Sequence, residues 1–201
     1  MTAIAAAVLA AGTGTRFGDV TKPLAPFGDE PLVLRATRAA LDSGLAPVLV
    51  VVGHAADRVA EVLPPDAEPV RNDAFASGIA SSLQAAVRAL VGRPVDGVVV
   101  GLADQPLVGP NAYRRLAAAY DDGARLAVAT YGGRRANPVL VAREHWTEAL
   151  DLAGDEGARA LMRRHPVVEV PCDDTGDPTD IDTPADLAAL EARWRSTTAS
   201  E

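Results

Sequence analysis

Apolar, strand-like runs alternate with helix-like segments along most of this 201-residue chain, and this alternation constrains the fold more than any other feature. Such an order gives a mostly parallel sheet with helices on both faces. Residues 48–52 and 97–101 are continuous apolar runs, which is typical of strands buried on both sides. We therefore predict a single α/β, Rossmann-like domain over residues 1–195 and a disordered tail at 196–201. Strands are expected at residues 4–9, 48–52, 68–71, 97–101, 126–130, 139–141 and 167–170, and helices at 31–41, 55–62, 79–90, 111–120, 144–150, 158–164 and 184–194.

The composition narrows the class of protein further. A formal net charge of -8 argues against non-specific binding to nucleic acid, which requires a basic surface. Cys172 is the only cysteine, so no internal disulfide demands an oxidising compartment. The chain shows no signal-peptide pattern and no apolar run near the length of about twenty residues that spans a bilayer. We expect a cytoplasmic protein without a membrane or nucleic-acid partner.

The first strand-like run leads into a loop of small residues at positions 8–18. Glycines there allow tight folding and let a ligand approach the main chain closely. Arg16 and Lys22 follow, and Lys22 is the only lysine among 19 basic residues. A lysine ammonium is a flexible point charge that suits a moving phosphate, so the loop predicts a polyphosphate site. The alternative is a solvated loop charge.

Two familiar glycine-rich loops do not match this segment. A dinucleotide-binding fingerprint needs a third glycine where Phe17 stands, and an acidic residue where the second strand ends at Gly53. A phosphate-loop NTPase needs glycine directly before its lysine and Ser or Thr directly after it, but Lys22 lies between Thr21 and Pro23. What remains is similar to the signature loop of nucleotidyltransferases with the GT-A-like fold.

Carboxylates suited to a magnesium ion follow two other apolar segments. Asp104 comes directly after a buried strand, and a single carboxylate beside a polyphosphate loop is a usual way to hold Mg²⁺. The alternative is an aspartate that caps a local turn. Asp180 and Asp182 alternate across Ile181, so both would face one side of an extended segment. One of them, with Asp182 preferred, could be the second metal ligand opposite Asp104.

Two helix starts carry polar residues. Residues 72–83 contain Gly78 and three hydroxyls, so free N–H groups and serine oxygens at this start could face a ligand. Ser77 could also cap this helix. Thr183 and Asp186 form a capping pattern for the last helix.

Taken together, these segments resemble the molybdenum cofactor cytidylyltransferase family, within the larger group that includes molybdopterin guanylyltransferases. The residues 10–12 and 104–106 favour the cytidylyl branch, because guanylyl enzymes more often carry Ala-Gly-Gly at the first position. The chain departs from the family pattern at Phe17, where Met is usual, and at residues 134–138, where the family commonly has Gly-His-Pro. The resemblance rests on residues 9–12, 16–18, 22, 78–83, 102–106, 154–159 and 180–184.

This resemblance implies a Mg²⁺-dependent enzyme that transfers CMP from CTP to the phosphate of molybdopterin or the molybdenum cofactor and releases pyrophosphate. A molybdenum hydroxylase apoenzyme would be a possible partner. The site residues then expected are Arg16, Lys22 and Asp104 for catalysis; Asp104 and Asp182 for the metal; Leu9, Ala10, Ala11, Gly12, Thr13, Gly14, Thr15, Gly53, Asn72, Gly78 and Ser82 for the nucleotide; and Arg134, Asn137 and Asp180 for the acceptor.

Two alternatives remain open. The same chemistry could use GTP or another NTP, with molybdopterin or a small phosphorylated acid or sugar as acceptor. A protein of another class could bind a nucleotide or deliver the cofactor without catalysis, although the presence of Arg16, Lys22 and Asp104 speaks against it.

Overall fold

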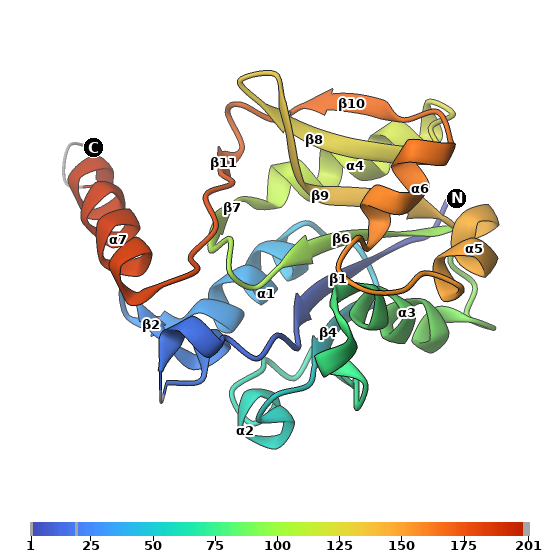
Figure 1. Cartoon of the computed structure of the whole chain (residues 1–201). Coiled ribbons are helices and arrows are strands. Elements are labelled where there is room, and N and C mark those ends of the chain that lie inside the picture. Colours follow the sequence, from blue (N-terminus) through green and yellow to red (C-terminus); the bar gives the residue numbers. More distant parts are fainter. Residues whose placement is uncertain (1, 19, 199–201) are drawn as a thin grey trace.

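The computed structural model describes residues 2–18 and 20–198, and a seven-stranded sheet lies at its centre (Figure 1). The strand order is β10-β8-β9-β6-β1-β4-β5. Of these strands, only β9 runs antiparallel to its neighbours, so the predicted α/β class with a mostly parallel sheet is confirmed. The strands are β1 (Ile4–Ala10), β4 (Val48–Val52), β5 (Ala67–Arg71), β6 (Gly97–Leu102), β8 (Leu126–Tyr131), β9 (Arg134–Ala142) and β10 (Val168–Pro171).

Helices cover both faces of the sheet, as predicted. The alternating side chains of β1 explain this, because Ala6 and Val8 pack on one face and Ala5 and Ala7 on the other. The first face carries α1, α2 and α4, and the second carries α3, α5 and α6. The bounds are α1 (Leu32–Asp42), α2 (Ala56–Ala60), α3 (Ile79–Leu90), α4 (Pro110–Asp121), α5 (Trp146–Leu150) and α6 (Ala158–Arg164).

A smaller apolar cluster holds the last helix, α7 (Pro184–Thr198), against the segment that follows the first loop. The rings of Phe27 and Trp194 pack in a tilted arrangement with centroids 5.5 Å apart, and the Arg35 guanidinium lies 4.2 Å from the centroid of the Trp194 ring. Ile181 is fully buried in this cluster, so the chain just before α7 is fixed beside the sheet. Paired here and nearby are the short strands β2 (Pro26–Phe27) with β3 (Glu30–Pro31), and β7 (Leu107–Val108) with β11 (Gly176–Asp177).

Several predicted bounds were wrong. The strand expected at 139–141 begins at Arg134, because polar residues at its start hid it from an apolar pattern. The helix expected at 144–150 is a 3-10 turn, η4 (Arg143–His145), followed by the short α5. α7 continues to Thr198, four residues past its predicted end at 194, and includes the first part of the predicted tail. Residues 199–201 of that tail lie outside the described residues.

The strands β1, β4 and β6 are parallel, so their carboxyl ends lie at one edge of the sheet. The loops that follow Ala10, Val52 and Leu102 therefore leave from the same edge. Within the described residues, no helix has both the length and the apolar character needed to cross a membrane.

Candidate active site

Three chain segments meet around the Lys22 ammonium at this edge of the sheet. Lys22 Nζ lies 2.7 Å from Oδ2 of Asp104 and 3.2 Å from Oδ1 of Asp182. Arg16 Nη1 lies 3.4 Å from Oδ2 of Asp182. The Lys22 side chain is only 14% exposed, whereas that of Arg16 is 71% exposed. The structure thus brings together the residues predicted for catalysis and metal binding, whose roles stay predictions.

The surrounding charges keep Lys22 protonated. Burial acts to lower the pKa of Lys22, but the charge of Asp104 and the hydrogen bonds to Asp104 and Asp182 outweigh it, so the pKa is raised above its ordinary value. A flexible ammonium held between two carboxylates can turn toward an incoming phosphate without first gaining a proton.

The loop before Lys22 folds back on itself at Gly14. This glycine has a φ of 57° and precedes a 3-10 turn, η1 (Thr15–Phe17). A Cβ on Gly14 would lie 2.6 Å from the Lys22 Cβ, so glycine is required for the two parts of the loop to pack together. Lys22 then begins a second turn, η2 (Lys22–Leu24). Gly14 and Thr15 shape the loop, and neither lines a cavity described below.

A capping box at the start of α7 fixes Asp182. The Thr183 N–H donates to Asp186 Oδ2 at 2.8 Å, and the Asp186 N–H donates to Thr183 Oγ1 at 3.2 Å. The Asp182 N–H donates to the same Asp186 carboxylate at 3.2 Å. The predicted cap is confirmed. It holds the backbone of Asp182, whose side chain contacts Lys22.

Asp104 offers an oxygen that no protein group uses. Its Oδ1 is buried and has no hydrogen-bond partner among the described residues, while Oδ2 binds Lys22. An unpaired buried carboxylate oxygen is costly unless a cation or water satisfies it. Because Mg²⁺ prefers one or two carboxylate oxygens together with phosphates and waters, Asp104 and Asp182 fit this ion.

Asp180 lies close to the same charges. Partial burial, followed by the charge of Asp104, raises the pKa of Asp180 above its ordinary value. The Ile181 N–H between the two aspartates donates to the Asp104 carbonyl at 2.9 Å, which ties this segment to the end of β6. Of the two candidates for the second ligand, Asp182 is the one that shares Lys22 with Asp104.

A cavity of about 420 Å³, which we name the loop pocket, opens beside Asp104. Its wall combines the end of β1, the first loop and the start of α3. Six of the residues predicted for the nucleotide line it. These six are Leu9, Ala11, Gly12, Thr13, Gly78 and Ser82.

Three other predicted nucleotide residues lie behind this wall. Ala10, the last residue of β1, is buried in the core. Gly53 packs so closely against the loop that a Cβ there would lie 2.8 Å from the Ala11 Cβ. Asn72 is a brace, because its Nδ2 donates to the hydroxyls of Ser81 at 2.9 Å and Ser82 at 3.1 Å. Asn72 therefore positions Ser82, which does line the pocket.

The hypothesis that Ser77 caps α3 is wrong. Ser77 Oγ donates to the Ala74 carbonyl at 2.7 Å, and the N-cap position is Gly78, with no side-chain cap. Gly78 has a φ of 108°, and a Cβ on it would clash with the Gly154 carbonyl. The Gly154 carbonyl accepts the Ala80 N–H at 3.0 Å, so the loop at 154–157 closes one side of the helix start.

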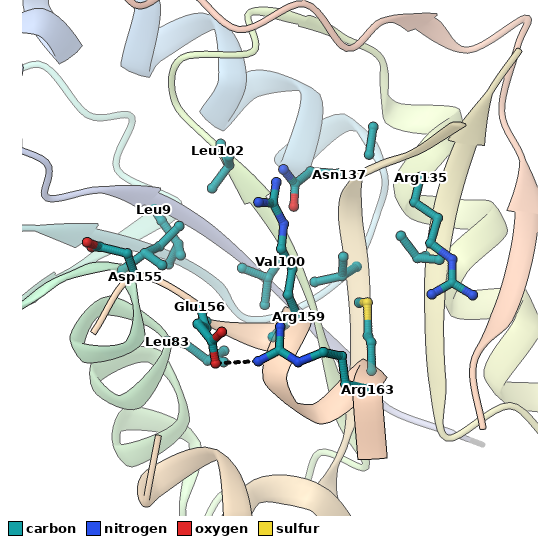
Figure 2. Close-up of a pocket in the computed structure, with 17 residues that line it drawn as sticks. Leu9, Leu83, Val100, Leu102, Arg135, Asn137, Asp155, Glu156, Arg159 and Arg163 are labelled. Carbon is teal, nitrogen blue, oxygen red and sulfur yellow. Dashed lines mark hydrogen bonds and ion pairs between the residues drawn. The ribbon is translucent and has the colours of Figure 1, made fainter. Parts of the chain in front are cut away.

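A second cavity, of about 380 Å³, adjoins the first and is named here the α6 pocket (Figure 2). Strand side chains such as Val100 and Val139 make an apolar floor, and α6 supplies Arg159 and Arg163. Figure 2 shows Arg159 extending toward Asn137, while Arg163 turns to Glu156. The two pockets share lining residues, so their contents would touch. The shared residues are Leu9, Ile79, Leu102 and Asp155.

The acceptor residues predicted from sequence are only partly placed in the α6 pocket. Asn137 lines it, whereas Arg134 and Asp180 line neither cavity. Arg134 belongs to β9 and not to the tip of the hairpin, and its neighbour Arg135 lines the pocket and pairs with Glu169 at 2.7 Å. Asp155 and Arg159 were missed as site residues. The motif at 154–159 was their signal in the sequence.

Comparison with known proteins agrees with this geometry. A family model described as the MobA-like NTP transferase domain matches residues 6–170. The chain belongs to this family. It is therefore a nucleotidyltransferase of the MobA-like group, and the match includes the first loop, Lys22 and Asp104.

Individual relatives cover almost the whole chain. Nicotine blue oxidoreductase of Paenarthrobacter nicotinovorans is 31% identical over 189 residues, which are 88% of this chain and 90% of the relative. The crystal structure of Rv0371c from Mycobacterium tuberculosis H37Rv is 30% identical with a TM-score of 0.84, and covers 95% of this chain and 98% of that chain. A complex of Rv0371c with manganese is 29% identical with a TM-score of 0.78, and covers 95% and 99% of the two chains.

Proposed function

We propose that this nucleotidyltransferase transfers CMP from CTP to the terminal phosphate of a molybdopterin-type acceptor. The observation that carries a transfer reaction is the pair of adjoining cavities that share four lining residues beside the Lys22–Asp104 contact. One cavity is built from the first loop and the other from apolar strand residues and arginines, so donor and acceptor would lie side by side.

CTP as donor is supported by the wall of the loop pocket. Ala11 is buried and lines the pocket where a Cβ on Gly53 would already meet it. A glycine at position 11 would leave that space open. The Ala11 methyl group fills the space beside Gly53, and the first loop therefore has the Ala-Ala-Gly form that the resemblance associates with the cytidylyl branch.

The chemistry needs positioning and charge neutralisation. An oxygen of the acceptor phosphate attacks the α-phosphorus of CTP, the bond to the bridging oxygen of the pyrophosphate breaks, and pyrophosphate leaves. The attacking oxygen is already ionised, so no general base is required. Lys22 and Arg16 would hold the triphosphate oxygens as negative charge moves onto the leaving group.

A divalent ion belongs in this scheme as the partner of the free Asp104 oxygen. Mg²⁺ held by Asp104 and Asp182 would supply Lewis-acid neutralisation of the triphosphate. The manganese complex of Rv0371c supports a divalent metal in this family. Lys22 would turn from its carboxylate partners to the phosphates, which its flexible stem allows.

The acceptor is supported by the chemistry of the α6 pocket. A floor of valine and leucine suits a flat ring system, and Arg159 at the wall suits an anionic end. Molybdopterin combines both properties. A molybdenum hydroxylase apoenzyme remains the proposed receiver of the product.

An oxidoreductase is the second candidate, because one relative carries that name and the apolar floor could equally hold an aromatic ring. The site itself favours the transferase, since a buried lysine between carboxylates is suited to phosphate charge and has no evident part in hydride transfer.

One experiment separates these functions. The protein is incubated with each NTP, Mg²⁺ and molybdopterin, and pyrophosphate and the dinucleotide product are measured. Product with CTP supports the proposal, and product with GTP alone moves it to a guanylyltransferase. Oxidation of a reduced nicotinamide cofactor without pyrophosphate favours the second candidate, and no turnover in either assay favours a binding or delivery protein.

A further inference from the structure

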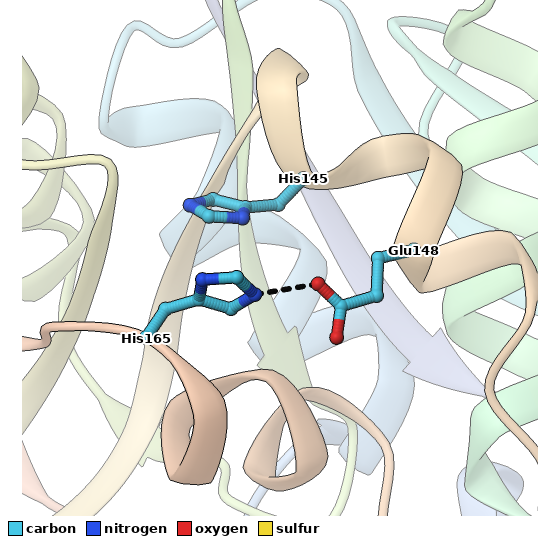
Figure 3. Close-up of side chains that lie close together, drawn as sticks. All are labelled: His145, Glu148 and His165. Carbon is cyan, nitrogen blue, oxygen red and sulfur yellow. Dashed lines mark hydrogen bonds and ion pairs between the residues drawn. The ribbon is translucent and has the colours of Figure 1, made fainter.

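Two histidines and a glutamate lie close together where α5 approaches the end of α6 (Figure 3). His145 ends the turn η4, Glu148 lies in α5, and His165 follows the last residue of α6. One ligand atom from each residue lies within 4.8 Å of those of the other two. His165 Nε2 is 2.5 Å from Glu148 Oε2, and the two imidazole rings are 4.5 Å apart at their centroids.

We propose that His145, Glu148 and His165 bind a divalent transition-metal ion of the Zn²⁺ class. Two imidazole nitrogens and one carboxylate oxygen are a donor set that Zn²⁺ uses with water in the fourth position. Ligand atoms about 2.0 Å from a tetrahedral Zn²⁺ lie roughly 3.4 Å apart. The present distances run from 2.5 Å between His165 and Glu148 to at most 4.8 Å, so small side-chain rotations would bring the three atoms to that spacing. All three side chains are half-buried, which limits competition from bulk water.

Neighbouring charges orient the glutamate. Arg164 Nη1 donates to Glu148 Oε1 at 2.7 Å, and Oε2 faces His165 Nε2, so the metal would take the place of the proton between these two atoms. Glu144 Oε1 lies 3.8 Å from His145 Nε2 and adds negative charge beside the ring. An oriented carboxylate and a nearby second carboxylate offset the positive charge of Arg164 and support a metal-binding arrangement.

This site is separate from the catalytic carboxylates. Ala142 at the end of β9 pairs with Gly97 at the beginning of β6, whereas Asp104 follows the other end of β6. The length of β6 puts about 20 Å between the two sites. A metal here would tie α5 to the end of α6, the helix that carries Arg159 and Arg163 into the α6 pocket. Its role is therefore to fix that wall.

Metal binding can be tested with the purified, metal-free full chain. Zn²⁺ is titrated by calorimetry into the wild type, His145→Ala, His165→Gln and His54→Ala. His54, the remaining histidine of the three in the chain, is exposed and serves as the matched control. Without nucleotide, so that the triphosphate of the Asp104 site is absent, we expect one tightly bound Zn²⁺ for each wild-type and His54→Ala chain. Binding should be at least a hundredfold weaker in the other two variants.

His165→Gln guards against a folding artefact, because glutamine can keep a hydrogen bond to Glu148 but is a poor zinc ligand. Zn²⁺ should raise the melting temperature of the wild type and of His54→Ala, but not of His165→Gln, when each is compared with its own chelator-treated sample. Wild type that binds no Zn²⁺, or equal affinity in all four proteins, would show that the cluster is an ion-pair network alone and would overturn the proposal.

Discussion

The loop pocket and the α6 pocket adjoin each other, but they are built differently. The loop pocket lies at the carboxyl ends of parallel strands. The basic and acidic side chains at its edge form ion pairs with one another around Lys22. The α6 pocket has an apolar floor and arginines on one wall, and Arg159 makes no ion pair within the described residues. The first region suits the metal and the polyphosphate that we propose, and the second still offers a cation to an anionic ligand.

The difference also explains what could be predicted from the sequence. At the loop pocket, Asp104 comes just after the apolar strand β6, Lys22 lies in the loop that follows β1, and Asp182 directly precedes a capping pattern, so all three could be found from the sequence. The α6 pocket depends on β9, whose polar first half lacks a strand pattern, and on Arg159, which is one of many helical arginines. The pairing register of β9 and the direction of the Arg159 side chain are set only when the chain folds.

Residues that support the pocket wall without lining it were harder to predict from the sequence. Asn72 and Gly53 each follow a strand and were predicted as nucleotide residues. In the structure Asn72 donates to Ser82, and Gly53 packs against the first loop. A strand-end position gives the neighbourhood of a residue and leaves open whether its side chain faces the cavity or the wall behind it.

The largest effect on catalysis should come from removal of the Lys22 ammonium, at the edge of the loop pocket. We expect Lys22→Ala to lower the turnover number by about a hundredfold or more, which is the scale of one preorganised donor. Pyrophosphate release at saturating NTP and acceptor measures it. Arg93→Ala is a matched loss of a cation, because Arg93 pairs with Glu68 and lines neither pocket. A Lys22→Ala rate within threefold of wild type would contradict a role for Lys22 in turnover.

A variant in the α6 pocket should affect the acceptor alone. Arg159→Ala should raise the KM for the acceptor about tenfold or more, because a charge-assisted hydrogen bond contributes about 1.5–3 kcal/mol. The KM for the NTP should stay unchanged. Initial rates with each substrate varied in turn give both values, and an equal rise in both would mean that the two cavities do not bind separate substrates.

Gly78 packs against the loop at 154–157, whose Asp155 lines both pockets. Substitution of Gly78 should therefore destabilise the wall that the two pockets share. In Gly78→Ala the new methyl group clashes with the Gly154 carbonyl, and the φ of 108° strains an alanine. We expect a loss of about 2 kcal/mol and a melting temperature lower by roughly 4–8 °C. Thermal unfolding measures this, with Gly12→Ala as control because a Cβ there meets nothing within 4 Å. Equal melting temperatures would show that the loop moves freely.

The smallest effect concerns the cap that holds Asp182. Thr183→Ala removes the hydroxyl that accepts the Asp186 N–H, which should cost about 1 kcal/mol and lower the melting temperature by roughly 2–4 °C. Because Asp182 loses part of its support, the Mg²⁺ concentration for half-maximal activity should rise. Thr183→Ser keeps the hydroxyl and should behave as wild type, and a Thr183→Ser loss equal to that of Thr183→Ala would point to packing instead of capping.

We propose that Asp104 holds a divalent ion for the triphosphate. A titration with Mn²⁺, monitored by electron paramagnetic resonance, measures this binding. The His165→Gln background removes the second proposed metal site. With CTP present, we expect one bound Mn²⁺ per chain, and at least tenfold weaker binding after Asp104→Asn. Equal Mn²⁺ affinity with and without the Asp104 carboxylate would contradict it.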